Sequence, residues 1–265
     1  MPEFELVDAH QHVGDLANVL PNGMVPESAS SAFEEDAANR ISAMDAAGVS
    51  WAVLQPNHGY LKPEGIADTM RLNDLMARYG QHAPDRFRAV FGTVEPTHGA
   101  HSLAEIDRCK HELGLDGISW HHRFQGCYID NKWMWPFLER MAALDLAAIV
   151  HVNAESSLEA AWRLQRLATD FPTVRFLAFD GLWSFERAGE IVFRASLTPN
   201  VIWDISGPAN YLVLENWVAR NGAETICYSM HGGAQLQQQI EHAAISDADK
   251  ALILGGNMKR MFALD

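Results

Sequence analysis

Two histidines near the N-terminus have the spacing of metal ligands carried by one β-strand. They lie in Asp8-Ala-His10-Gln-His12, directly after the apolar run Phe4-Glu5-Leu6-Val7. If that run is a strand, His10 and His12 point to the same face, because side chains alternate with a period of two. Neutral imidazoles bind Zn²⁺ and related metals. The chain has 12 histidines, so the pair alone is weak evidence and needs a third ligand.

His151 is the best candidate for that third ligand. It follows Ala147-Ala148-Ile149-Val150, an apolar run that we interpret as another strand. A lone histidine at a strand end is often a hydrogen-bonded core residue, and this alternative stands beside the ligand interpretation. Because His10 and His12 are already paired, we favour the ligand: three neutral imidazoles are a common shell for borderline metals.

The segment Trp120-His121-His122-Arg123 offers groups for catalysis and substrate binding. His121 and His122 are adjacent and face opposite ways in an extended chain, so at most one of them points into a shared site. Arg123 either clamps a substrate carboxylate through two hydrogen bonds or pairs with an acid at the surface.

Two further polar residues at strand ends have competing interpretations. His58 follows Pro56-Asn57 and either contacts a substrate or, as a loop histidine, lies in solvent. Asp204 follows the apolar run Val201-Ile202-Trp203. There we favour a structural role, in which Asp204 caps the following loop, over a role in chemistry.

A repeating pattern of strands and helices would position these residues. Short β-rich apolar runs recur along the chain, and the segments between them carry apolar residues at i, i+3 and i+4. Examples of the predicted helices are Ala32–Ala47 and Leu158–Phe171, the second with Ser156-Ser157 as N-cap residues. The predicted strands lie near Phe4–Asp8, Ser50–Gln55, Arg88–Val94, Gly117–Trp120, Ala147–Val152, Val174–Phe179, Val201–Ile205 and Thr225–Ser229.

Eight such units predict an α/β protein with a single domain, residues 1–265, folded as a closed (β/α)8 TIM barrel. The alternative is an open doubly wound sheet, which would show a glycine-rich phosphate turn after the first strand; Asp8–His12 is no such turn. Active sites of these barrels lie at the carboxyl ends of the strands, where the residues above are expected. The long polar segment Gly14–Ser31 follows the histidine pair and is placed to cover the site.

Composition limits the class of partner. The net charge of −14 argues against nucleic acid and against an anionic membrane. An anionic small-molecule substrate stays open, because charges farther away than a Debye length of about 8–10 Å are screened. Cys109, Cys127 and Cys227 form no CxxC pair, and neither a signal peptide nor an apolar run of membrane-spanning length is found. We expect a soluble, cytoplasmic protein without a disulfide scaffold.

The opening Asp8-Ala-His10-Gln-His12 resembles the amidohydrolase superfamily, and more narrowly its amidohydrolase-2 group. Three later segments resemble that group in the same order: Asp116–His121, Ala148–His151 and the closing Ile253–Phe262. The group contains metal-dependent hydrolases, decarboxylases of aromatic or muconate-type acids, and lactonases. The resemblance implies a divalent metal held by the histidine pair and His151, with zinc as the first expectation and manganese as the second. It also implies a homodimer or homotetramer.

Two strand ends depart from the pattern of the group. Where the group has a histidine after strand six, this chain has Phe179 followed by Asp180. Where the group has an aspartate after strand eight that binds the metal and handles a proton, this chain has Met230 followed by His231. A thioether is a soft, neutral ligand and no base. Either Asp180 or His231 has taken over the role, or the activity is lost.

The first expectation for function is a metal-dependent hydrolase of a small carboxylated, cyclic or aromatic substrate. The metal would lower the pKa of water to about 7, and Asp180 or His231 would take its proton. His121 is the third catalytic candidate and, with Arg123, would hold the anionic group of the substrate; His58 is a further substrate contact. The alternatives are a non-oxidative decarboxylase of an aromatic or muconate-type acid, a metal-independent lactonase, and a barrel that only binds.

Overall fold

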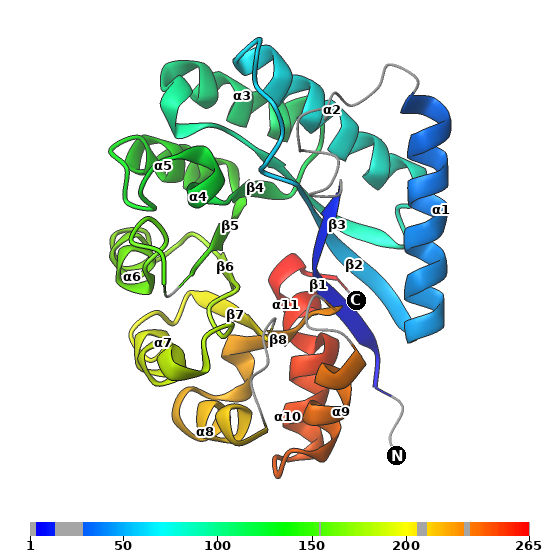
Figure 1. Ribbon diagram of the computed structural model, residues 1–265, viewed down its shortest axis with the longest axis vertical. Coiled ribbons are helices and arrows are strands. Elements are labelled where there is room, and N and C mark those ends of the chain that lie inside the picture. The colour runs from blue at the N-terminus through cyan, green and yellow to red at the C-terminus, as the bar shows by residue number, and fades with distance from the viewer. Residues whose placement is uncertain (1–3, 14–28, 154, 206–210, 231–233, 265) are drawn as a thin grey trace.

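The computed structural model describes residues 4–13, 29–153, 155–205, 211–230 and 234–264. Within these residues, eight strands form one parallel sheet in chain order and alternate with helices (Figure 1). The strands are β1 (Leu6–Val13), β2 (Val49–Pro56), β3 (Phe87–Thr93), β4 (Gly117–Trp120), β5 (Ala147–His151), β6 (Phe176–Phe179), β7 (Val201–Ile205) and β8 (Ile226–Tyr228). The predicted (β/α)8 barrel is confirmed.

The helices surround this sheet, as Figure 1 shows. They are α1 (Ala29–Ala47), α2 (Ile66–His82), α3 (Ala100–His111), α4 (His122–Gln125), α5 (Met134–Leu144), α6 (Ala161–Asp170), α7 (Ala188–Ala195), α8 (Tyr211–Asn221), α9 (Ala234–His242), α10 (Asp247–Ala251) and α11 (Asn257–Phe262). Along the described part of the chain, no helix combines the length and the apolar composition that crossing a membrane requires.

A side-chain contact joins the first strand to the last. The backbone N–H of Met230, just after β8, donates to Asp8 Oδ1 on β1 at 2.8 Å. Between these two edges, each strand pairs in parallel with the next. A parallel sheet is covered on both faces, and every residue of β4, β5 and β6 is buried.

The interior of the barrel is filled by side chains. Trp51, Phe91 and Leu177 are buried there in one apolar cluster, which also includes Met258 and Met261 of α11. Helix α11 therefore covers one end of the barrel, and Figure 1 shows it at the centre of the ring of helices. Residues that precede strands hold it there: Arg175, just before β6, donates to the backbone carbonyl of Met261. The carboxyl ends of the strands form the opposite end.

Strand β1 extends farther toward the C-terminus than the sequence predicts. Its pairing with β2 continues as far as Val13, which lies opposite Pro56, so the strand does not end at Asp8. The register shifts between Asp8 and Gln11. The histidine pair is therefore part of the strand. Its polar residues interrupt the apolar pattern because they line the mouth of the barrel.

The connection between β5 and α6 also differs from the prediction. Helix α6 begins at Ala161, three residues later than expected, and Ser156-Ser157 do not cap it; the residue before it is Ala160, which makes no side-chain cap. Instead, the backbone N–H of Asn153 donates to the carbonyl of Glu159 at 3.0 Å. This bond joins the two ends of the connection and returns Glu159 to the mouth of the barrel.

Helix α1 also starts at a different residue from the one predicted. The helix begins at Ala29, three residues before the predicted start at Ala32. The segment Gly14–Ser31, which we expected to cover the site, lies outside the described residues except for its last three, which belong to α1.

Candidate active site

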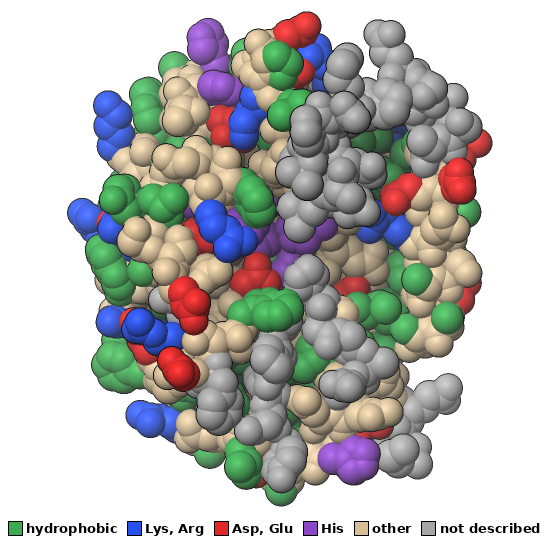
Figure 2. Space-filling view, viewed as in Figure 1, with side chains coloured by type: hydrophobic (Ala, Val, Ile, Leu, Met, Phe, Trp, Pro, Cys, Tyr) green, Lys and Arg blue, Asp and Glu red, His purple; other side chains and the backbone are tan. Residues whose placement is uncertain are grey.

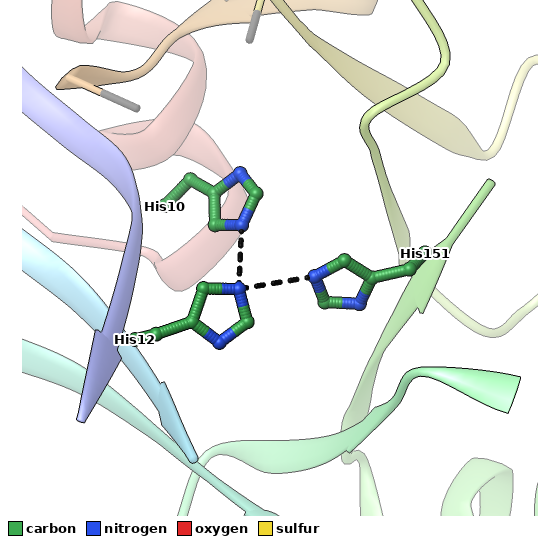
Figure 3. Close-up of side chains that lie close together, drawn as sticks. All are labelled: His10, His12 and His151. Atoms are coloured by element: carbon green, nitrogen blue, oxygen red, sulfur yellow. Dashed lines mark hydrogen bonds between the residues drawn. The ribbon is translucent and has the colours of Figure 1, made fainter. Parts of the chain in front are cut away.

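Three histidine rings meet at the carboxyl ends of β1 and β5, as Figure 3 shows. His12 Nε2 lies 3.0 Å from His10 Nε2 and 3.3 Å from His151 Nε2. His10 and His151 are buried, and His12 is partly buried. The structure thus places together the three residues that the sequence singles out as metal ligands.

The other ring nitrogen of each histidine faces a hydrogen-bond acceptor. His10 Nδ1 lies 2.8 Å from Asp204 Oδ2, His12 Nδ1 lies 3.2 Å from the carbonyl of Pro56, and His151 Nδ1 lies 2.9 Å from the carbonyl of Trp120. A carbonyl or carboxylate oxygen can only accept, so each Nδ1 carries the hydrogen. In the neutral ring this leaves a lone pair on every Nε2.

The three lone pairs therefore face one another, an arrangement that a cation between them would stabilise. Around a tetrahedral metal with bonds of 2.0–2.1 Å to nitrogen, two ligand nitrogens are about 3.3 Å apart. The separations of 3.0 and 3.3 Å between the Nε2 atoms match this spacing. A hydrogen bond from each Nδ1 to an acceptor is also how proteins orient metal-binding histidines. The residues fit a divalent metal ion.

Asp204 has a larger part in the site than the sequence suggests. The loop that we expected it to cap, residues 206–210, lies outside the described residues, but the buried carboxylate accepts from His10 Nδ1 through Oδ2 and from the backbone N–H of Asp180 through Oδ1, at 3.0 Å. Ser229 Oγ donates to it more weakly, at 3.4 Å. The side chain thus orients one of the three histidines.

A buried chain of polar groups borders the three histidines. Ser119 Oγ donates to Gln55 Oε1 at 2.5 Å and lies 3.1 Å from His58 Nε2. Gln55 Nε2 lies 3.4 Å from His12 Nε2 and 3.4 Å from His151 Nε2. Burial and the neighbouring His151 lower the pKa of His58 well below its usual value, so His58 is neutral. His58 is 1% exposed, which excludes the solvated-loop interpretation.

His121 and Glu159 form a second pair beside the three histidines. His121 Nδ1 donates to Glu159 Oε1 at 2.6 Å, and the same oxygen accepts from the backbone N–H of Arg123 at 2.9 Å. The His121 ring stacks on the His151 ring, with centroids 4.2 Å apart. Burial raises the pKa of Glu159. His121 lines the cavity, whereas its neighbour His122 is fully buried and stacks on Trp120.

The strand-six position holds two residues with different surroundings. Phe179 stacks on the His10 ring at 4.1 Å and meets the His151 ring edge-on, so it forms an apolar wall. Asp180 has a φ of 66°, in the left-handed region that aspartate adopts more readily than most residues. This conformation brings Asp180 Oδ2 to 3.9 Å from His151 Nε2, while Oδ1 accepts from Trp183 Nε1 at 3.0 Å.

These side chains surround a cavity of about 600 Å³ at the mouth of the barrel. Figure 2 shows histidines in the hollow at the centre of this face, with arginine and acidic side chains around it. Arg123 and Arg40 both line the cavity. Arg40 pairs with Asp36 at 2.6 Å, whereas the Arg123 guanidinium makes no ion pair with any described residue.

The strand-eight position lacks an acid. Met230 lines the cavity, and its backbone is held by Asp8. His231, the alternative proton acceptor, lies outside the described residues. Three polar residues that sequence reasoning missed contribute to the site: Gln55, Ser119 and Glu159. Gln55 stands near the end of β2, and a polar residue at a strand end is the signal in the sequence that could have identified it as part of the site.

Comparisons with known proteins place this chain in a family. A family model described as amidohydrolase matches residues 7–222. The 2-keto-4-carboxy-3-hexenedioate hydratase of Sphingobium sp. (strain NBRC 103272 / SYK-6) is 24% identical over 278 residues, 85% of this chain and 82% of that protein. The gamma-resorcylate decarboxylase of Polaromonas sp. (strain JS666 / ATCC BAA-500) is 29% identical over 151 residues, 52% of this chain and 45% of that protein. This second match spans less than half of the decarboxylase.

A solved structure is also similar over nearly its whole length. It is the dihydroxybenzoic acid decarboxylase of Polaromonas sp. JS666 with bound manganese and the inhibitor 2-nitroresorcinol. It has a TM-score of 0.72 and 20% identity, and the match covers 98% of this chain and 97% of that chain. At this identity the likeness concerns the fold. The family model covers well over half of the sequence, and this chain therefore belongs to the amidohydrolase family.

Proposed function

We propose that this protein is a metal-dependent, non-oxidative decarboxylase of a small aromatic acid. The observation that carries the proposal is the convergence of three Nε2 lone pairs, on His10, His12 and His151, whose Nδ1 atoms are all held by acceptors. Decarboxylase activity on hydroxylated benzoic acids is found among the similar proteins, and the similar solved structure holds manganese. Manganese and zinc are the ions to test.

The three histidines would hold the metal, which when bound supplies a Lewis acid that attracts the carboxylate and hydroxyl oxygens of the substrate. Arg123 would bind a second anionic or hydroxyl group through its planar guanidinium. Phe124 and Trp183 line the same cavity and are 39% and 48% exposed. Exposed aromatic faces of this kind suit a planar aromatic ring.

His121 is the proposed proton donor. Loss of carbon dioxide leaves the electrons of the broken C–C bond on the ring carbon, which must receive a proton. His121 Nδ1–H is held by Glu159 Oε1 at 2.6 Å, so the proton is exchanged at Nε2. A fixed imidazole of this kind serves as a general acid. Glu159 acts through His121 and is a positioning residue.

The hydrolase that we expected first receives less support. Hydrolysis needs a base that takes a proton from water, and Met230 occupies the strand-eight position where the resemblance places an aspartate. Of the described carboxylates near the histidines, Asp204 and Glu159 accept from histidine rings, and Asp180 Oδ2 lies 3.9 Å from His151 Nε2. In the decarboxylase, Asp180 would position the substrate. Hydration is the second candidate, because the similar hydratase matches 85% of this chain.

The proposal is tested with protein reconstituted with Mn²⁺ or Zn²⁺ and incubated with gamma-resorcylate, other hydroxybenzoic acids and 2-keto-4-carboxy-3-hexenedioate. Carbon dioxide and the product are measured by gas analysis and NMR. Release of carbon dioxide from an aromatic acid, lost in His121→Phe, is expected. Addition of water to the hexenedioate without release of carbon dioxide would replace decarboxylase by hydratase. Turnover of neither class by metal-loaded protein would contradict the proposal.

A further inference from the structure

Gln55 lies where a fourth protein ligand of the metal would lie. It belongs to β2, the neighbour of the strand that carries His10 and His12, and its side chain is fully buried. One terminal amide atom lies 3.4 Å from both His12 Nε2 and His151 Nε2. Two ligand atoms of a tetrahedral centre are about 3.3 Å apart, so these two distances are those expected if the amide and the histidines shared one metal ion.

The orientation of the amide depends on what it faces. In the structure, the Nε2 hydrogens of Gln55 face the lone pairs of His12 and His151, and Oε1 faces Ser119. A carboxamide turned by 180° exchanges its oxygen and nitrogen at nearly the same positions. An NH₂ group cannot bind a cation, whereas an amide oxygen can. A bound metal therefore requires the turned amide, with Oε1 toward the histidines.

Ser119 permits both orientations. A hydroxyl donates one hydrogen and accepts two. Ser119 Oγ now donates to Gln55 Oε1, so His58 Nε2, 3.1 Å from the hydroxyl, must carry the hydrogen that bridges them. When the amide turns, Ser119 accepts from Gln55 and donates to His58 Nε2. The hydrogen bonds that join Gln55, Ser119 and His58 are kept, and the hydrogen of neutral His58 moves to Nδ1. The contacts of the Gln55 NH₂ group with His12 and His151 are given up, and the metal would take their place.

The surrounding residues explain why a neutral ligand matters here. Met230 stands at the strand-eight position, so that strand supplies no carboxylate. Three imidazoles and an amide oxygen are all neutral, so these four ligands would leave the charge of the ion uncompensated, and Asp180, 3.9 Å from His151 Nε2, would be a carboxylate near it. A fully charged ion attracts an anionic substrate more strongly than one that a carboxylate ligand partly neutralises.

From this geometry we propose that Gln55 Oε1 is the fourth protein ligand of the metal and that Ser119 holds its amide in the metal-binding orientation. The inference rests on the proposed function, because it requires that the three histidines bind a metal. It adds a ligand from β2 and assigns a task to the buried serine.

The test measures metal affinity by competition with a chelator, using Mn²⁺ and Zn²⁺ with wild type, Gln55→Leu, Gln55→Glu and Gln125→Leu. Gln125 is a matched control: it is also a buried glutamine near the mouth, but its amide donates to the carbonyl of Val94. We expect Gln55→Leu to weaken binding about 10- to 100-fold, as loss of groups around a metal does. We expect Gln125→Leu to bind as wild type does, and Gln55→Glu to bind more tightly, because its oxygen is charged.

The outcomes separate this inference from the proposed function. If wild type binds neither ion, the metal-dependent function fails, and the ligand assignment fails with it. If wild type binds but a folded Gln55→Leu protein binds equally well, only the ligand assignment is overturned. If Gln55→Leu does not fold, the metal affinity of Gln55→Glu tests the assignment, because glutamate has nearly the same shape as glutamine. Weaker binding by Gln55→Glu than by wild type would show that the residue does not ligate the ion.

Discussion

The histidines of the site differ in what holds their ring nitrogens, and this difference sets their roles. His10, His12 and His151 each donate from Nδ1 to an acceptor. His121 donates to a carboxylate. Both ring nitrogens of His122 are buried and have no hydrogen-bond partner among the described residues. We therefore propose that metal binding, proton transfer and packing belong to different rings.

His122 should make the fold sensitive to acid. Burial and the nearby His121 lower the pKa of His122 from 6.5 to about 3. As pH falls below 6.5, the unfolded chain takes up this proton and the folded protein does not, so stability is lost between these two values. At pH 5 the loss is about 2 kcal/mol. Urea unfolding at pH 7 and pH 5 should show a smaller loss for His122→Phe, which keeps the stacking on Trp120. Equal losses in both proteins would contradict this account.

Arg123 should determine the affinity for an anionic substrate. A hydrogen bond to a charged group contributes about 1.5–3 kcal/mol, so Arg123→Ala should raise KM about 10- to 100-fold, and Arg123→Lys should fall between. The matched control is Arg40→Ala, because Arg40 lines the same cavity but is paired with Asp36. Steady-state kinetics check the prediction. An equal rise in KM for the two alanine variants would show that only the general charge of the cavity matters.

Glu159 should act on turnover rather than on substrate binding. Positioned acid–base catalysis contributes about 10²–10⁴-fold, and Glu159 only orients the acid. We expect Glu159→Leu to lower kcat about 10- to 100-fold with little change in KM. Glu159→Gln, which can still accept from His121 Nδ1, should be less affected. Separate values of kcat and KM for the two variants give the answer, and a change confined to KM would remove Glu159 from the proton-transfer step.

The sequence indicates part of this site and not the rest. The period of two along a strand and the position at a strand end identify His10, His12 and His151. Glu159 cannot be found that way, because a backbone hydrogen bond across the connection after β5 brings it back to the mouth. The contact of Asp204 with His10 could not be predicted, because a strand-end aspartate looks the same in sequence whether it caps a loop or accepts from a histidine.

The strands bring the site together and tolerate little change where they pack closely. At Gly117, the first residue of β4, a Cβ would lie 2.1 Å from the backbone carbonyl of Ala147 and 2.3 Å from the Phe91 ring. The carbonyl belongs to the neighbouring strand and cannot move aside as a flexible side chain can. Three residues later, β4 ends at Trp120, whose carbonyl holds His151.

Gly117→Ala should therefore destabilise the barrel by about 1–3 kcal/mol or more, the usual cost of overpacking. Gly189→Ala is the control, because a Cβ there meets nothing within 4 Å and alanine favours a helix such as α7. Thermal melts of both variants check the prediction. A Gly117→Ala protein as stable as wild type would show that β4 and β5 are not packed as closely as described.

The ends of strands and helices were harder to predict than the presence of the strands and helices themselves. Strand β1 was predicted to end at Asp8 because the following residues are polar, but they are polar because they face the site. Helix α6 was predicted to begin at Leu158, whereas Glu159 is held at the mouth and the helix starts at Ala161. In both places, contacts within the site determine where the strand ends or the helix begins, and the local sequence pattern does not.

The (β/α)8 barrel could be predicted from the sequence because a chain of alternating strands and helices is compatible with few topologies. Eight alternating units without a phosphate-binding turn favour the closed barrel, and the strand order agrees. A metal would add a link between strands that are far apart in the chain, since His10 and His12 lie on β1 and His151 lies on β5.

Binding of a metal should therefore stabilise the entire molecule. A ligand at about 1,000 times its Kd stabilises the folded state by about 4 kcal/mol. We expect Mn²⁺ or Zn²⁺ to raise the Tm of chelator-treated wild type and to leave the Tm of His10→Ala nearly unchanged. Differential scanning calorimetry with and without the ion measures both shifts. An equal rise in the two proteins would place the binding elsewhere on the molecule.

Metal content tests the central claim most directly. Wild type, the double variant His10→Ala/His12→Ala and the control His101→Ala, an exposed helix position, are equilibrated with Mn²⁺ or Zn²⁺, freed of excess ion and subjected to elemental analysis. We predict about one ion per chain in wild type and in the control, and almost none in the double variant. A wild-type protein without metal, or a double variant that retains as much as wild type, would contradict the account.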